Sequence, residues 1–197
     1  MAFKLPSDYN TASTGEYRSL PAGGYICRII KAEETKSKTG KDMLKIAFDI
    51  CDGDFTGYFM DQFQNRKASA EDPSAVKWAF SGTKWIMILN NEGKTNTDFK
   101  AFGTALTESG CKAIDTVKMT CDASMMKDAQ IGIVFRREEQ EWEGKTSWRT
   151  IPFRFRSVSA IESGDYTVPD DKPLSKPAAL DLTGIDSFQA AEDDIPF

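Results

Sequence analysis

The sequence predicts a mainly β protein: a five-stranded Greek-key barrel with helical insertions, followed by a disordered acidic C-terminal tail. Three observations support this prediction. Apolar and polar side chains alternate along most of the chain, turn-forming residues separate the alternating runs, and the periodicity stops at Pro169. The chain has 197 residues, of which 40% are hydrophobic. We therefore expect one core-forming domain over residues 1–168 and a tail over residues 169–197.

The first half of the chain contains three predicted strands. Gly23-Gly24 leads into an apolar strand over residues 25–30, and a basic turn follows at residues 35–42. Asp52-Gly53 is typical of a hairpin turn and predicts a third strand over residues 55–59. The second strand, residues 43–50, has the alternation of a half-buried strand, with its apolar face made of Leu44, Ile46, Phe48 and Ile50.

The middle of the chain predicts two helices. Asp72-Pro73 provides an N-cap and a first-turn proline for a short helix through Phe80. Residues 84–89 are a short apolar run that fits either a strand or a buried helical turn. Thr97 caps the second helix, which ends near Gly110 and has Phe99, Phe102 and Leu106 on one stripe.

Two strands end the predicted domain. Residues 131–136 alternate between apolar and other side chains, and Phe153 and Phe155 alternate with Arg154 and Arg156. Residues 138–148 are expected to connect them. Three antiparallel strands, a helical insertion and a two-stranded hairpin are the order expected of a small OB-type barrel. A split β-sandwich is the alternative.

The tail differs from the rest of the chain in composition and charge. Residues 169–197 contain four of the eight prolines, seven acids and two lysines, which gives a net charge of −5. Residues 1–168 are neutral, with 23 residues of each sign. A segment without apolar periodicity cannot bury enough surface to offset its ordering entropy. We therefore expect a disordered linker that carries a terminal peptide.

Several functional classes are disfavoured by composition. The chain has no histidine, and its four cysteines form no CxxC pair, so we expect no metal and no cofactor. The longest apolar run covers residues 85–89, far short of the ~20 residues that span a bilayer. The N-terminus lacks an apolar signal region. We expect a cytoplasmic protein with reduced thiols; whether it forms a homo-oligomer is left open.

The last five residues predict a docking peptide. Ile195 and Phe197 are suited to an apolar pocket on a partner, while Asp193, Asp194 and the terminal carboxylate suit a basic rim. Pro196 stiffens the peptide and lowers the entropy lost on binding. The alternative is a solubilising acidic tail whose apolar end has no role.

This tip resembles the C-terminus of bacterial and phage single-stranded DNA-binding proteins. The body is similar to the small phage-encoded members found in recombination and replication cassettes, roughly from residue 20 to residue 169. The resemblance rests on "LPAGGY" (Leu20–Tyr25), "SKTGKDML" (Ser37–Leu44), "IGIVFRREEQEWEGKTSWRT" (Ile131–Thr150) and "SVSAIESGDYTVP" (Ser157–Pro169). It implies an OB-fold body that binds the strand, and a tip that recruits replication, recombination and repair proteins.

In an OB barrel the strand lies across the second and third β-strands, between the loop joining strands 1 and 2 and the loop joining strands 4 and 5. Cations for phosphates and aromatic rings for bases are expected there. The first loop provides Lys36, Lys38 and Lys41, with Lys45 just beyond, and the second provides Trp142, Lys145, Trp148 and Arg149. Tyr58 is a further stacking candidate. Arg136, Arg154 and Arg156 form either a basic stripe or ion pairs with Glu138 and Glu139.

For individual residues, a position without any role in binding stays open. Lysines in a turn are often only solvated, and Trp148 suits a core position as well as a groove. At the level of the whole protein, the alternative to DNA binding is an adaptor whose tail docks replication proteins while the barrel is a scaffold. The neutral body favours this alternative, because non-specific nucleic-acid binding usually needs visible positive charge.

Enzymatic interpretations are weaker. The "KTGKD" segment lacks the glycine that a phosphate loop needs at Thr35 and the hydroxyl that it needs at Asp42. Glu143-Gly144-Lys145 has the E-x-K spacing of magnesium-dependent nucleases, but it lies on a predicted turn with no well-placed aspartate before it. The sequence therefore predicts a non-enzymatic protein that coats single strands during phage replication or recombination.

Overall fold

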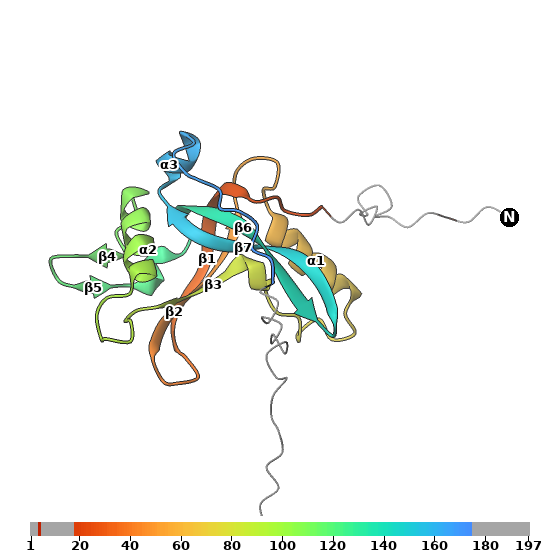
Figure 1. Cartoon of the computed structure of the whole chain (residues 1–197), viewed down its shortest axis with the longest axis horizontal. Coiled ribbons are helices and arrows are strands. Elements are labelled where there is room, and N and C mark those ends of the chain that lie inside the picture. Colours follow the sequence, from red (N-terminus) through yellow and green to blue (C-terminus); the bar gives the residue numbers. More distant parts are fainter. Residues whose placement is uncertain (1–3, 5–17, 175–197) are drawn as a thin grey trace, which may run out of the picture.

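The protein is built on a five-stranded antiparallel sheet with few helices (Figure 1). The computed structural model describes residue 4 and residues 18–174. The mainly β class is confirmed, but no hydrogen-bonded ladder joins the two edge strands within the described residues. The order is β3-β2-β1-β6-β7, with β1 at Gly23–Lys36, β2 at Asp42–Ile50, β3 at Thr83–Met87, β6 at Gln130–Trp142 and β7 at Lys145–Arg156.

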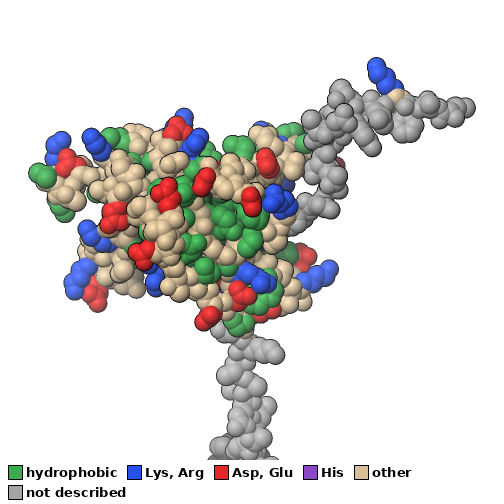
Figure 2. All heavy atoms as spheres, turned by 90° about the horizontal axis from the view of Figure 1, so that it is seen from above, with side chains coloured by type: hydrophobic (Ala, Val, Ile, Leu, Met, Phe, Trp, Pro, Cys, Tyr) green, Lys and Arg blue, Asp and Glu red, His purple; other side chains and the backbone are tan. Residues whose placement is uncertain are grey.

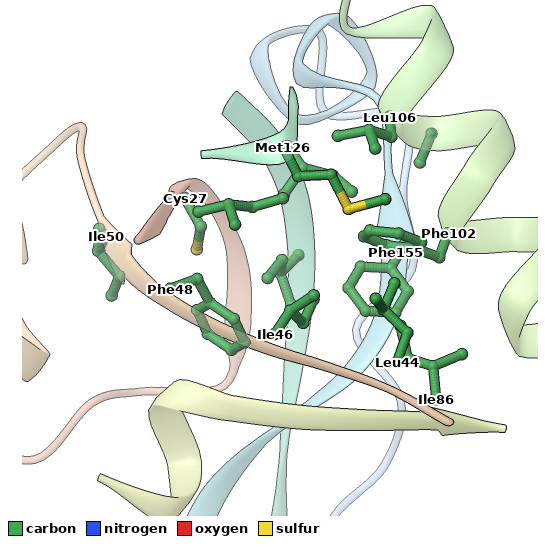
Figure 3. Packing of buried hydrophobic residues seen from close by; sticks show 14 of the residues in the cluster. Cys27, Leu44, Ile46, Phe48, Ile50, Ile86, Phe102, Leu106, Met126 and Phe155 are labelled. Carbon is green, nitrogen blue, oxygen red and sulfur yellow. The ribbon is translucent and has the colours of Figure 1, made fainter. Parts of the chain in front are cut away.

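The core lies on one face of this sheet, beneath the helix α2 (Thr97–Glu108) (Figure 3). The predicted alternation of β2 is confirmed, because its four apolar side chains at positions 44, 46, 48 and 50 are at most 2% exposed. The rings of Phe102 from α2 and Phe155 from β7 meet edge to face, with their centroids 5.0 Å apart. Alternation in the sequence therefore determines which apolar face of β2 packs into the core.

The predicted third strand is wrong. Residues 52–57 form turns, and the helix α1 (Tyr58–Ser69) begins where the strand was expected. The cause is Asp49 on β2, which is only 8% exposed. Its carboxylate accepts hydrogen bonds from the backbone N–H groups of Phe59 at 2.8 Å and Met60 at 3.1 Å. It thereby supplies acceptors that the helix's own N-cap residue, Gly57, cannot provide.

Asp49→Ala should lower the free energy of unfolding by about 1–2 kcal/mol, the usual loss when a helix N-cap acceptor is removed. Burial raises the pKa of Asp49, and the N–H groups that it accepts from offset this effect only in part. Thermal or urea unfolding measures the change. Asp52→Ala removes the same charge from an exposed turn and is the matched control. Equal stability of the two variants would contradict the capping role.

The helix predicted through residues 73–80 is also wrong. Asp72 accepts a hydrogen bond from the Ser74 N–H at 2.9 Å, but this closes only a turn. The indole N–H of Trp78 donates to the carbonyl of Gly82 at 3.0 Å. This hydrogen bond ties Trp78 to the 3₁₀ turn η1 (Phe80–Gly82). Strand β3 follows, so residues 84–87 of the open run 84–89 form a strand, while Leu89 forms an isolated bridge with Thr95.

The second predicted helix, α2, is confirmed. Its cap is Asn96 rather than Thr97, because the Asn96 side chain accepts from the Asp98 N–H at 2.8 Å. Gly110, with φ of +89°, follows its end as expected. The remaining elements are β4 (Ile114–Asp115), β5 (Thr120–Cys121), the 3₁₀ turn η2 (Ala123–Met126) and α3 (Val158–Glu162).

The hairpin of β6 and β7 is longer than predicted. Residues 138–148, expected to be a loop, continue both strands to a two-residue turn at Glu143 and Gly144. Both turn residues have positive φ, 50° and 74°. This backbone conformation fits the right-handed twist of a hairpin. Trp142, Lys145, Trp148 and Arg149 therefore lie on paired strands.

The chain on both sides of Pro169 stays in contact with the sheet. Tyr166 covers β1 at Gly24, where a Cβ atom would lie 2.5 Å from the tyrosine Cζ. Lys172 then pairs in parallel with Glu138 on the edge of β6. The chain thus keeps contact with the sheet beyond Pro169. Residues 175–197, which include the whole docking tip, lie outside the described residues. The disorder expected of them stays a prediction. No helix in the described part is both long and apolar enough to cross a membrane.

Candidate nucleic-acid interface

A cleft of about 610 Å³ lies between α1, η1 and β7. It brings together three of the residues that the sequence predicted, Tyr58, Trp148 and Arg149. The sequence analysis missed most of its other polar and aromatic residues. These include Gln62, Asn65 and Arg66 from α1, Phe80 and Ser81 from η1, and Ser147 and Thr150 from β7. Strand β7 and the distant pair α1 and η1 therefore form one cavity with both cationic and aromatic walls.

Aromatic rings line the cleft from three elements. Phe80 is 55% exposed and Trp148 is 43% exposed. The ring of Tyr58 is packed edge-on against Phe55 and Phe59, with centroids 6.0 and 5.2 Å away. Trp148 has the guanidinium of Arg137 above its ring, with Cζ 5.0 Å from the centroid. The exposure of Trp148 favours a groove position over the core position that the sequence also allowed.

The aromatic surface continues onto the outer face of β2 and β3. Trp85 is 40% exposed. The centroid of its ring lies 5.5 Å from that of Phe80, and the two ring planes are inclined at 35°. Trp85 is the cross-strand neighbour of Lys45. Phe80 therefore links the cleft to this face. Trp85 alternates with the buried Ile86, and this alternation would identify Trp85 as an exposed residue. It can be used only when residues 84–87 are known to form a strand.

Three of the four lysines predicted in the first loop have partners. Lys36 pairs with Asp42 at 2.6 Å, and Lys41 donates to the Asn91 side chain at 2.6 Å. Lys45 pairs with Glu33 at 2.9 Å. Hydrogen bonds from Lys31 and Lys45 lower the pKa of Glu33 to about 2. A phosphate would have to compete with these acceptors. Lys38, in the turn between β1 and β2, forms no ion pair with any residue of the described part.

The tip of the β6–β7 hairpin carries an exposed pair. Trp142 is 77% exposed and faces Lys145 across the two strands. In Figure 1 this tip and the turn between β1 and β2 both project from the lower half of the view, on either side of β3. Neither Trp142 nor Lys145 lines the cleft itself.

The three predicted arginines do not form one stripe. Arg136 is paired with Glu138, and its guanidinium lies 4.2 Å from the ring centroid of Phe153. The pairing alternative therefore applies to Arg136, whose side chain is only 21% exposed. Arg154 is exposed and lies 5.1 Å from the same ring, while Arg156 is half-buried. None of the three lines the cleft.

Charges of both signs are interspersed on one face of the molecule. Figure 2 shows blue and red side chains mixed over one face, with no single-sign patch. This agrees with the neutral composition of residues 1–168. Any nucleic-acid affinity of this surface must then depend on ring stacking and local cations more than on a broad positive field.

A second cavity, of about 500 Å³, lies between α2 and the β4–β5 hairpin. It is lined mainly by apolar groups, among them Ile88, Phe99 and Ile114, and by none of the residues that the sequence predicted to bind DNA. In the described part, no three histidine, cysteine or acidic side chains are placed to hold a metal ion.

Comparison with known proteins identifies the family of this chain. A family model described as "Protein of unknown function (DUF669)" matches residues 7–141. The match covers more than half of the chain, which therefore belongs to this family. A search of curated proteins finds no match.

Proposed function

We propose that this member of the DUF669 family is a single-stranded DNA-binding protein of the phage type. It coats single strands during replication or recombination in the cytoplasm of a bacterial host, and its C-terminal tip recruits partner enzymes. The observation that carries the proposal is the cleft between α1 and β7. Exposed rings from Phe80 and Trp148 lie there with the cations Arg66 and Arg149.

We also propose that the sheet is a partly open OB-type barrel. Three features of the topology support this interpretation. The first strand lies between the second strand and β6, the third strand and β7 are the two edges, and α2 follows the third strand. The Lys84 ammonium on β3 bridges the edges by donating to the backbone carbonyls of Pro152 at 3.2 Å and Phe153 at 3.4 Å on β7. Burial lowers the pKa of this lysine.

The chemistry of the surface suits unstructured strands. An aromatic face stacks on any base and contributes about 1–3 kcal/mol per base, with little sequence preference. In a duplex the faces of the bases are already stacked, and recognition there requires an element that reads base edges in a groove. The path from Trp148 past Phe80 to Trp85 provides successive rings. No reaction, metal or cofactor enters this proposal.

Oligo-dT should bind the full-length protein and should be clearly preferred to a duplex of the same length. Affinity should fall as salt rises, because each phosphate contact releases counterions. Fluorescence anisotropy with a labelled oligonucleotide at several salt concentrations measures both effects. The absence of binding to oligo-dT at low salt would overturn the DNA-binding proposal.

One specific observation favours the adaptor as a second candidate. The lysines at positions 36, 41 and 45 already have partners, and the face that Figure 2 shows has no single-sign patch. In this alternative the barrel is a scaffold and the tip alone acts. It predicts capture of replication proteins by the tail together with no binding of oligo-dT. The same anisotropy measurement therefore separates the two candidates.

A further inference from the structure

The chain after α3 forms an isolated β-bridge with the open edge of β6. Strand β1 pairs with β6 only as far as Phe135, so that edge of β6 is unpaired beyond it. Lys172 occupies this edge: its N–H donates to the carbonyl of Arg137, and its carbonyl accepts from the N–H of Glu139, both at 2.9 Å. The backbone N–H of Leu174 donates to a Glu139 carboxylate oxygen at 3.1 Å.

This segment also holds two neighbours of Trp148. Glu139 is the cross-strand partner of Trp148. Arg137 lies two residues before Glu139 and so shares its face of the hairpin. One Arg137 nitrogen forms an ion pair with Asp171 at 3.2 Å, while the guanidinium carbon lies 5.0 Å from the Trp148 ring centroid. A continuous chain of contacts thus runs from Asp171 through Arg137 to Trp148.

We propose that Asp171 is a positioning residue for the single-strand site and that residues 170–174 belong to the binding domain rather than to the tail. Asp171 holds the Arg137 guanidinium against one side of the Trp148 ring, and the ring is thereby kept in place along the cleft wall. A base that stacks on Trp148 then meets a ring that is already ordered, so less entropy is lost on binding. This inference rests on the proposed function.

A second possible role for Asp171, masking the charge of Arg137, predicts the opposite change in DNA affinity. The Arg137 side chain is 44% exposed and the Asp171 side chain 43%. If Asp171 only masked a phosphate-binding cation, removing its charge would free Arg137 and tighten binding. If Asp171 positions Trp148, removing its charge weakens binding. The sign of one substitution therefore decides between the two roles.

The test uses the full-length protein and three substitutions. Asp171→Asn should weaken oligo-dT binding about 3- to 10-fold, and Asp171→Glu, which keeps the charge, should restore most of the affinity. Asp170→Asn is the matched control, since it removes the same charge one residue away, where no ion pair with Arg137 exists among the described residues. It should leave binding unchanged or slightly tighter. Tighter binding by Asp171→Asn would overturn the positioning role.

A double-mutant cycle separates positioning from general damage to the fold. Asp171→Asn should have little effect on oligo-dT binding when Trp148 is already alanine, because residues that act through one contact are not additive. Additive losses would contradict the proposal.

A measurement without DNA keeps this inference distinct from the proposed function. Asp171→Asn should increase acrylamide quenching of the tryptophan emission, and the increase should vanish in the Trp148→Ala background. If the wild-type protein fails to bind oligo-dT but this quenching result holds, the proposed function fails while the contact chain to Trp148 stands. If quenching is unchanged, the positioning role is wrong.

Discussion

Replacing Trp148 with alanine should weaken the binding of oligo-dT by about 5- to 150-fold, which corresponds to about 1–3 kcal/mol of lost base stacking. Trp148 is the larger of the two rings more than 40% exposed that line the cleft between α1 and β7. Because a ring contributes through its face and not through charge, the salt dependence of binding should stay almost the same. Equilibrium titrations at several salt concentrations measure both quantities.

Two contrasting variants sharpen this prediction. Lys38→Ala removes a cation in the first loop and should flatten the slope of log K against log salt by about 0.7, with little loss at high salt. Trp142→Ala removes the 77% exposed ring at the hairpin tip and should also weaken binding if the strand passes the tip. Normal binding by Trp148→Ala together with a loss in Trp142→Ala would move the base-stacking site from the cleft to the tip. Thermal unfolding of each variant checks that the fold is retained.

Removing Phe197 alone should abolish capture of replication, recombination or repair enzymes. The terminal ring is the apolar anchor of the predicted docking peptide, and loss of such an anchor typically costs about 2 kcal/mol or more, at least thirtyfold in affinity. All seven acids after Pro169 remain. Binding to oligo-dT should therefore change little. The measurement is a pulldown from a bacterial lysate with the full-length chain and with the chain that lacks Phe197. Mass spectrometry identifies the captured proteins.

A chain that ends after Leu174 is the second arm of this experiment. It lacks five acids and one lysine, a net charge of −4, but keeps the β-bridge at Lys172. It should fail to capture partners. It should also bind oligo-dT more tightly at low salt, because the tethered acids no longer compete with phosphates, and equally at high salt. Capture of the same enzymes without Phe197 would mean that the terminal aromatic has no role.

Local patterns were sufficient for much of the fold. The alternation along residues 43–50 and 131–136 identifies two strands, and for residues 43–50 also the apolar face that is buried, because the side-chain period of a strand is a local property. In β6 both faces are buried over residues 131–135, which alternation alone does not predict. The stripe of Phe99, Phe102 and Leu106 identifies α2 in the same way. The residue types at the candidate site were also visible, since Tyr58, Trp148 and Arg149 were all singled out from the sequence.

The errors arose where a single side-chain hydrogen bond decided the local conformation. Residues 55–59 alternate like a strand, but the N–H groups of Phe59 and Met60 bind the buried carboxylate of Asp49, ten and eleven residues earlier, and a helix begins instead. Asp72 and Pro73 carry helix-start signals, but the chain after them is held by the Trp78 hydrogen bond to Gly82. Neither contact leaves a periodic trace in the sequence.

The sequence by itself determined the β class, the buried apolar face of β2, the change of composition at Pro169 and the kinds of side chain available to bind a strand. Only the tertiary structure decided which of these side chains meet. It placed Phe80 and Arg66 beside Trp148, paired Arg136 with Glu138, and added Lys172 to the edge of β6. The physical reason is range: periodicity and turn chemistry act over a few residues. A cleft depends on packing and hydrogen bonds between elements that lie about 70–100 residues apart in the chain.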